Sequence, residues 1–157
     1  MQVNRRILSL ALLVLLLIGC NTSPEKTEAQ ATFIDAKIFV SPLVNPDINN
    51  RPSPIVVRIF ELKNLGNYSE SDFYGLFENY ESILGGDILS SEQFNLNPGD
   101  TQGWKKNAAP ETQYIAVIAA FRDINQAMWR DSIIISVEKN LRLLIYVDKL
   151  SISVWKK

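Results

Sequence analysis

The sequence predicts a mostly β protein, a β-sandwich of about seven to eight short strands with one added amphipathic helix. Short apolar or alternating segments recur along the chain, and clusters of Pro, Gly, Asn and Asp separate them. One stretch, residues 69–84, instead repeats its apolar side chains at intervals of three and four. That spacing is typical of a helix with one buried face.

The strands are predicted from two patterns. Residues 33–40 alternate apolar and polar side chains, as expected for a strand with one buried face. Residues 55–62 and 114–121 are almost wholly apolar, which indicates two central strands. The remaining predicted strands are residues 93–96, 132–137, 141–147 and 150–154, and Trp104 lies in a further short segment.

The connections carry recognisable turn and cap residues. Ser69 and Asp72 resemble a capping box at the start of the predicted helix, and Gly85 with Gly86 is a good stop. The run 97–100, Asn-Pro-Gly-Asp, predicts a tight turn. Further turns are expected at residues 64–68, 138–140 and 148–149.

The N-terminus has the pattern of an export signal. Arg5 and Arg6 precede an apolar run over residues 7–18, and the run ends in Leu-Ile-Gly-Cys at residues 17–20. A helix of that length spans about 18 Å, too little for a hydrocarbon core of about 30 Å. The ending resembles a bacterial lipobox, in which the thiol of Cys20 is acylated and the chain is cut before it. The alternative is an ordinary signal peptide whose cleavage site holds a Cys.

The chain therefore divides into three predicted parts. Residues 1–19 form a lipoprotein signal peptide, residues 20–32 the lipidated Cys20 with a polar tether, and residues 33–157 the β-sandwich domain. The twelve residues after Cys20 reach about 40 Å at most when fully extended. The expected membrane attachment is the covalent lipid on Cys20, and no other cofactor is predicted.

Composition excludes several classes of site. The chain has no His and a single Cys, so Ser-His and Cys-His catalysis, zinc sites with nitrogen and sulfur ligands, and disulfides are excluded. The formal net charge is −1 and there is no basic run, which argues against a nucleic-acid partner. We predict no catalytic residue and no metal ligand, and so no enzyme.

The connection over residues 41–54 is unusual. It contains four prolines and is longer than the two to five residues that are usual, roughly, for a hairpin. Leu43, Val44 and Ile48 place apolar side chains in it. In one interpretation Leu43 and Val44 tuck under the edge of the sheet. In the other the prolines preorganise a binding loop, which loses little entropy when it docks.

Several segments together resemble the type VI secretion lipoprotein TssJ family. They are RPSPIVVRIFEL at residues 51–62, the helical stretch 73–80, LNPG at 96–99, and YIAVIAAFRD at 114–123 followed by Trp129 and Arg130. The lipobox and the short tether lie where that family has them. The resemblance covers nearly the whole chain after residue 19.

This resemblance implies a transthyretin-like β-sandwich in an outer-membrane lipoprotein that faces the periplasm. The implied partner is the periplasmic C-terminal region of TssM, with TssL in the same complex. In the family, the loop between the first two strands is tied to TssM binding. The implied partner-binding residues are Leu43, Val44, Asn45, Pro46, Asp47, Ile48, Asn49, Asn50 and Arg51.

Three functions remain open at this stage. The first is an adaptor that fixes an inner-membrane partner to the outer membrane, and Asn21 after Cys20 favours the outer membrane. The second is a periplasm-facing lipoprotein that binds a small ligand or glycan, for which Trp104, Trp129 and Trp155 are the available tryptophans. The third is a carboxylate-based hydrolase, for which the sequence holds no specific catalytic signal.

Overall fold

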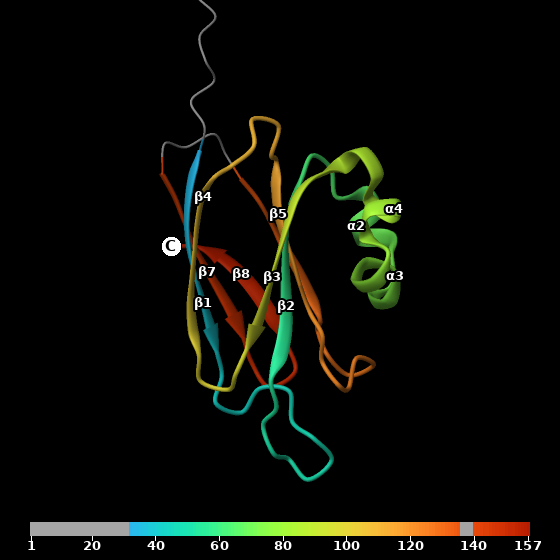
Figure 1. The fold of residues 1–157 in the computed structure, drawn as a ribbon, viewed down its shortest axis with the longest axis vertical. Helices are drawn as coiled ribbons and strands as arrows, with labels where there is room; N and C mark the ends of the chain where they lie inside the picture. Colours follow the sequence, from blue (N-terminus) through green and yellow to red (C-terminus); the bar gives the residue numbers. More distant parts are fainter. Residues whose placement is uncertain (1–31, 136–139) are drawn as a thin grey trace, which may run out of the picture.

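Two four-stranded sheets face each other in the computed structural model, which describes residues 32–135 and 140–157 (Figure 1). Every neighbouring pair of strands is antiparallel except β1 and β7, which are parallel. The first sheet has the order β4 (Thr101–Asn107), β1 (Phe33–Val40), β7 (Asn140–Val147), β8 (Ile152–Lys156). The second has the order β3 (Ile88–Leu96), β2 (Ile55–Leu62), β5 (Tyr114–Ala119), β6 (Arg130–Ile134). The predicted mostly β sandwich is confirmed.

The main core fills the space between the sheets. On β1 the buried side chains are Ile34, Ala36, Ile38 and Val40, the face that the alternating pattern predicts. Strands β2 and β5 are buried along almost their whole length and lie in the middle of their sheet. Both cores and the eight strands that the structure describes consist of residues within 32–157, so a chain that starts at Asn21 retains all of these contacts.

Some predicted bounds differ from the structure. The strands at residues 33–40 and 55–62 have the predicted limits, whereas β3 begins at Ile88 rather than at residue 93. Strand β6 begins two residues earlier than predicted, and β8 both begins and ends two residues later. The predicted signal peptide, Cys20, residues 21–31 of the tether and residues 136–139 lie outside the described residues.

The helical stretch is not one helix. It consists of α2 (Gly66–Glu70), α3 (Phe73–Glu78) and α4 (Tyr80–Leu84), followed by the short 3-10 turn η1 (Gly85–Asp87). The side chain of Asp72 accepts a hydrogen bond from the N–H of Gly75 at 2.7 Å, so Asp72 caps α3 by itself. The predicted capping box at Ser69 is wrong, because Ser69 lies inside α2.

The three helices cover the outer face of the β2-β5 sheet (Figure 1). A second core fills this contact, and its members are Phe60, Leu62, Tyr68, Leu76, Leu84, Ala116 and Ile118. No helix among the described residues is long and apolar enough to cross a membrane.

Hydrogen bonds lock the helices to the sheet. The hydroxyl of Tyr68 donates to the carbonyl oxygens of Val117 at 2.8 Å and Asp131 at 3.0 Å. The guanidinium of Arg130 donates to the carbonyl oxygens of Tyr68 at 3.0 Å and Ser71 at 2.8 Å. These bonds join residues 49 to 63 positions apart in the sequence, so the helical layer is held in a fixed place on the sheet.

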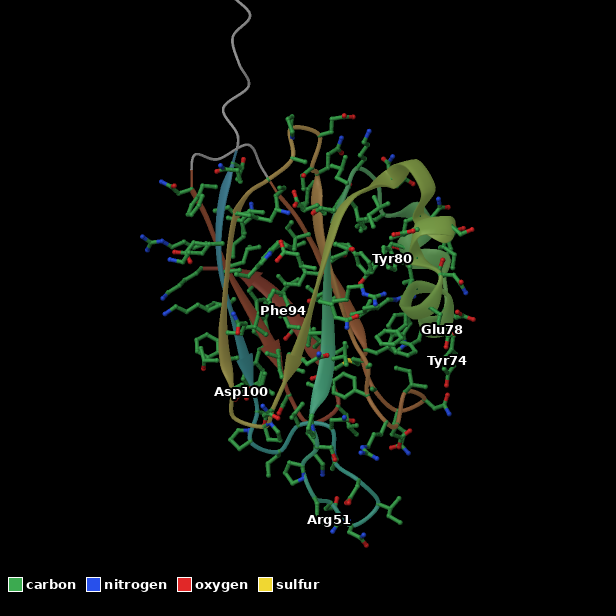
Figure 2. All side chains as sticks on the ribbon, in the orientation of Figure 1. Arg51, Tyr74, Glu78, Tyr80, Phe94 and Asp100 are labelled. Carbon is green, nitrogen blue, oxygen red and sulfur yellow. The ribbon has the colours of Figure 1, made fainter. Side chains whose placement is uncertain are left out.

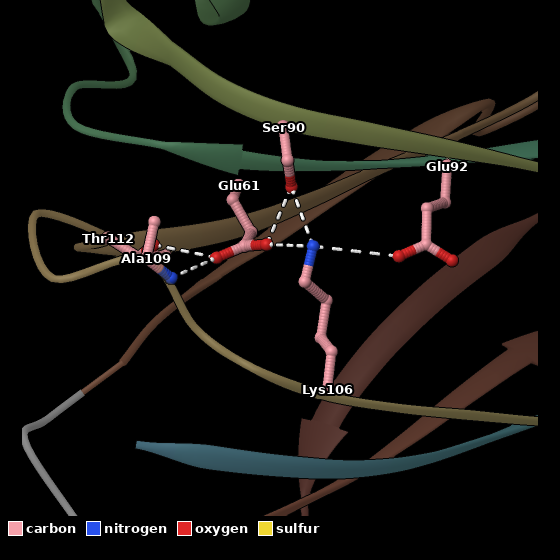
Figure 3. A network of polar contacts seen from close by, with 6 residues as sticks. All are labelled: Glu61, Ser90, Glu92, Lys106, Ala109 and Thr112. Atoms are coloured by element: carbon pink, nitrogen blue, oxygen red, sulfur yellow. Dashed lines mark hydrogen bonds and ion pairs between the residues drawn. The ribbon is translucent and has the colours of Figure 1, made fainter. Parts of the chain in front are cut away.

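A buried carboxylate joins the sheets at the end of the sandwich where β1 begins (Figure 3). The side chain of Glu61 is about 1% exposed and accepts bonds from the ammonium of Lys106 and the hydroxyl of Ser90, both at 2.6 Å. It also accepts bonds from the hydroxyl of Thr112 at 2.8 Å and the N–H of Ala109 at 2.9 Å. Burial raises the pKa of Glu61, but these hydrogen bonds outweigh it and hold the pKa below its ordinary value.

Candidate partner-binding loop

Residues 41–54 connect β1 to β2 and project from the end of the sandwich opposite the start of β1 (Figure 1). The base of this loop is closed by backbone hydrogen bonds. The N–H of Ser41 donates to the carbonyl of Val147 at 2.8 Å, and the N–H of Ser53 donates to the carbonyl of Val44 at 3.1 Å. Val44 is fully buried in the main core, so the loop enters and leaves the sandwich at a fixed point.

Asn45 holds the middle of the loop to two neighbouring connections. Its side-chain amide donates to the carbonyl of Pro54 and accepts from the N–H of Arg122, both at 2.8 Å. Its own N–H donates to the carbonyl of Lys149 at 3.0 Å. Its φ of 48° lies in the left-handed region, which Asn tolerates better than most residues. Asn45 thus attaches the loop to the segments after β5 and after β7.

Asp47 and Arg51 fix the outer part of the loop, where Figure 2 labels Arg51. One carboxylate oxygen of Asp47 accepts from the backbone N–H groups of Asn49 at 2.8 Å and Arg51 at 2.9 Å. The other oxygen accepts from the guanidinium of Arg51, with an N–O distance of 2.7 Å. The N–H of Arg51, and then its guanidinium, hold the pKa of Asp47 below its ordinary value. The outer part is therefore a hydrogen-bonded turn.

The loop exposes apolar side chains that folding does not use. Ile48 is 98% exposed and Leu43 is 61% exposed. Val44 takes the buried position that one interpretation of the sequence assigned to both Leu43 and Val44. Each interpretation therefore describes part of the loop: Val44 fixes it from inside, and Leu43 and Ile48 point away from the sandwich.

The nine predicted partner-binding residues divide into two groups. Val44 and Asn45 are buried, and Pro46 and Asp47 are half-buried. The exposed residues, which are available to a partner, are Leu43, Ile48, Asn49, Asn50 and Arg51.

Two residues that the sequence did not predict lie beside the loop. Arg122 and Asp123, which follow β5, line a shallow groove together with Pro46, Asp47 and Ile48. Both are exposed, and the N–H of Arg122 is bonded to Asn45. In the sequence they stand directly after the innermost strand, but no local signal indicates that β5 ends next to residues 45–48.

The three tryptophans are separated in the structure. Trp104 is buried in the main core, and Trp129 packs edge-on against Phe73 with ring centroids 5.4 Å apart. Trp155 is half exposed on β8. They do not line a common cleft. Among residues 32–135 and 140–157, no three Cys, Asp or Glu side chains are grouped as metal ligands.

Solved structures show the same fold. The lipoprotein TssJ1 of Pseudomonas aeruginosa is 25% identical with a TM-score of 0.78, and the match covers 81% of this chain and 97% of TssJ1. Serratia marcescens Lip, a membrane-bound component of the type VI secretion system, is 25% identical with a TM-score of 0.74, over 81% of this chain and 98% of Lip. A chain in a structure described as a type VI membrane complex shares the fold at 24% identity and a TM-score of 0.71, over 80% and 99%.

Sequence comparison leads to the same family. No curated protein sequence matches the chain significantly. The family model described as type VI secretion lipoprotein, VasD, EvfM, TssJ matches residues 32–150. This match includes seven of the eight strands, all three helices and the loop at residues 41–54. The chain therefore belongs to the type VI secretion lipoprotein family, to which TssJ belongs.

Proposed function

We propose that the chain is a lipid-anchored adaptor of the type VI secretion membrane complex. An acylated Cys20 holds the N-terminus in the outer membrane, residues 21–32 act as a short tether, and the sandwich faces the periplasm. The loop at residues 41–54 binds the periplasmic C-terminal region of TssM, and TssL belongs to the same complex. The family supports this role, as does the same fold in a chain of a type VI membrane complex.

The observation that carries the proposal is Ile48, 98% exposed on a loop that hydrogen bonds hold in place. Burying a whole aliphatic side chain of this size contributes roughly 1.5–3 kcal/mol. Because Ile48 is exposed in the folded domain, this free energy would be gained only when a partner covers the side chain. Because the bonds of Asn45 and Asp47 already order the loop, little conformational entropy remains to be lost when a partner covers Ile48.

The surroundings of Ile48 suit a protein partner. Polar Asn49, Asn50 and Arg51 follow it in the exposed part of the loop, and Leu43 adds a second apolar side chain. An apolar centre with a polar rim is the usual composition of a protein–protein contact. The groove beside Arg122 and Asp123 offers the partner one further cation and one carboxylate.

The other two functions have less support. A glycan site needs aromatic side chains around a cleft, and the three tryptophans lie apart, with Trp104 buried. A hydrolase needs a carboxylate whose pKa is raised. Glu61, the one buried carboxylate among the described residues, has a lowered pKa and accepts four hydrogen bonds from neighbouring side chains and backbone. We therefore propose that the chain is not an enzyme and that its part in the secretion system is structural.

The test is binding of residues 21–157 to the periplasmic C-terminal region of the TssM-like protein of the same secretion system. We expect Ile48→Ser to weaken binding at least about tenfold, or about 1.4 kcal/mol. Ile48 makes so little contact inside the domain that the melting temperature should stay unchanged. Titration calorimetry measures the affinity, and thermal unfolding checks the fold.

Tyr74→Ser is the matched control. Tyr74 is a large exposed side chain on α3, in the helical layer rather than on the loop, and we expect its replacement to leave the affinity unchanged. Equal affinity of the wild type and Ile48→Ser would move the interface away from the loop and retain the adaptor. Absence of binding by the wild-type domain would remove the adaptor proposal itself.

A further inference from the structure

The outer face of the β4-β1-β7-β8 sheet is open among the described residues, because the three helices all pack on the other sheet. Four of the large apolar side chains that the structure exposes lie here, namely Phe33, Phe39, Tyr146 and Trp155. A contiguous group of exposed apolar side chains on one face is a candidate contact surface, whereas single exposed apolar side chains are normal.

Strand register arranges this face in rows. Phe39 on β1 lies opposite Tyr146 on β7, and Leu144 on β7 lies opposite both Lys37 on β1 and Trp155 on β8. Side chains in such positions are cross-strand neighbours on the same face of the sheet. Phe39, Tyr146, Leu144 and Trp155 therefore form one continuous apolar surface, in which Trp155 is 50% exposed. Phe33 lies apart from it, opposite Asn140.

Cations border the aromatic rows. Lys37, Arg142 and Lys157 line a shallow groove on this face together with Asp35. The carboxylate of Asp35 already pairs with Lys105 at 3.4 Å. The face thus carries a surplus of positive charge, although the whole chain has a formal net charge of −1. Positive charge beside Trp and Tyr is the composition that binds the headgroup region of an anionic membrane.

We propose that this face docks on an anionic phospholipid surface. The geometry of the chain supports that occupant: β1 belongs to this sheet and begins at Phe33, and twelve residues separate Phe33 from Cys20. Those twelve residues reach at most about 40 Å, so a membrane that holds Cys20 lies within that distance of the start of β1, on the strand that carries Lys37 and Phe39. This step rests on the lipid anchor of the proposed function, whereas the aromatic and cationic rows are independent of it.

A second copy of the chain fits this face less well. A two-fold axis through the cationic groove would bring Lys37, Arg142 and Lys157 of the two copies together, and like charges repel. A membrane contact also leaves the proposed partner site free. The loop at residues 41–54 extends from the end of the sandwich rather than from this face (Figure 1), so lipid and protein partners need not compete.

The experiment measures sedimentation of unlipidated residues 21–157 with vesicles. One set contains phosphatidylcholine alone, and the other contains about 30% phosphatidylglycerol in phosphatidylethanolamine. We expect preferential binding to the second set, weakened by high salt. The variant Lys37→Glu with Arg142→Glu should lower the partition coefficient at least about tenfold, since each cation near an anionic surface contributes to attraction. Trp155→Ser, made in the wild type, should also weaken binding to the anionic vesicles.

Two controls match these changes. Lys149→Glu alters an exposed cation in the turn after β7, outside the rows, and Tyr74→Ser removes an exposed aromatic ring on the helical side. We expect both to bind anionic vesicles as the wild type does. Thermal unfolding of each variant shows that it is folded.

Equal binding of the wild type to both sets of vesicles would overturn the inference, and so would equal binding of the double variant and the wild type to anionic vesicles. It would also be overturned if light scattering showed that the wild type is a dimer and the double variant a monomer. The last outcome would assign the face to a second copy. Affinity for the TssM-like partner is measured in parallel with the double variant. Retained partner affinity with lost vesicle binding supports the inference, whereas the effect of Ile48→Ser tests the adaptor proposal separately.

Discussion

The two ends of the sandwich each contain a carboxylate that accepts several hydrogen bonds, but the two networks differ in what they hold. Glu61 lies inside, where it joins β2 to Ser90 on β3, Lys106 on β4 and the connection after β4. Asp47 lies at the opposite end and bonds only to residues of its own loop. The first network links elements far apart in sequence, and the second shapes one connection.

The network of Glu61 stabilises the fold, whereas the network of Asp47 holds the loop in the conformation that exposes Ile48. Removing a buried partner of Glu61 exposes no binding surface but leaves an uncompensated charge in the interior, which is costly. The network of Asp47 buries almost nothing and keeps Ile48 in water. We therefore expect changes near Glu61 to appear in the free energy of unfolding and changes in the loop to appear mainly in partner affinity.

The largest expected effect is that of Glu61→Ala. The substitution leaves the ammonium of Lys106 without its closest carboxylate and removes the acceptor for Ser90 and Thr112. We expect the free energy of unfolding to fall by about 3 kcal/mol, measured by urea denaturation. Partner affinity of the folded fraction should stay unchanged, because the loop is at the other end.

Glu111→Ala provides the exposed counterpart. Glu111 pairs with Lys63 at 2.7 Å, but its side chain is largely in solvent, and such pairs contribute about 0–1 kcal/mol. If both substitutions cost the same, the distinction between a buried and an exposed carboxylate network in this protein is wrong.

An intermediate effect is expected for Asn45→Ala. It removes the bonds to the carbonyl of Pro54 and from the N–H of Arg122, and it places Ala at a φ of 48°. Two hydrogen bonds and the left-handed backbone together account for about 2–3 kcal/mol of unfolding free energy. Partner affinity should also fall although Ile48 is intact, because the less ordered loop then loses conformational entropy when it binds.

Asn50→Gly is the control for the backbone term. Asn50 has a φ of 58°, a conformation that Gly adopts without strain, and it is exposed. We expect Asn50→Gly to change the free energy of unfolding by no more than about 0.5 kcal/mol. If Asn45→Ala leaves the partner affinity at the wild-type value, the order of the loop does not matter for binding.

The smallest expected effect is the pH dependence of partner affinity through Asp47. Its pKa is lower in the folded loop than its ordinary value of 3.8, so the order that it gives the loop is complete above that pH. This order is lost as the pH falls through the lower folded value, when the carboxylate protonates. We expect affinity to fall in the same range.

Asp47→Asn isolates the contribution of Asp47 to the pH dependence, because the amide does not titrate. The affinity of this variant for the partner, measured by calorimetry, should already be reduced at neutral pH. It should vary less in acid than the affinity of the wild type. Glu61 also has a lowered pKa and loses its contribution to stability below its ordinary value of 4.5. The fraction of folded protein must therefore be measured at each pH. A parallel decline of both proteins would assign the pH dependence to other groups.

The strands were predictable because their signals are local. The alternating residues 33–40 and the apolar run 55–62 fall on β1 and β2 with the expected limits. The turn at 97–100 is likewise formed, with Gly99 at a φ of 82° and a bond from the N–H of Asp100 to the carbonyl of Asn97 at 3.1 Å. In each case the residues that determine the structure lie within a few positions of one another.

The helical stretch shows the limit of periodicity. Asn79 has a φ of −130° and separates α3 from α4, while the apolar spacing continues across it. A Cβ atom added to Gly75 would lie 2.6 Å from the end of the Ile83 side chain, so the two short helices pack closely here and Ile83 would have to shift to admit a larger residue. Periodicity records which side chains are buried and does not record where the backbone bends between them.

The contacts of the loop depend on residues distant in sequence. Asn45 bonds to Arg122, seventy-seven positions away, and Glu61 bonds to Lys106 across the sandwich. The sequence indicated a long, proline-rich connection that carries aliphatic side chains, and this is present. One interpretation of the sequence placed Val44 inside. The sequence did not indicate that Asn45 is internal or that Arg122 and Asp123 lie beside Ile48, because these facts arise from the order of the strands.

Strand β1 has a mechanical consequence. It begins next to the tether and ends at the loop, and it pairs along its eight residues with β4 on one side and β7 on the other. A pull between a membrane at the N-terminus and a partner at the loop would run along the axis of this strand. All of its ladder hydrogen bonds would then share the load in shear, rather than break one after another. Tension would pass from membrane to partner through one strand, without peeling either sheet.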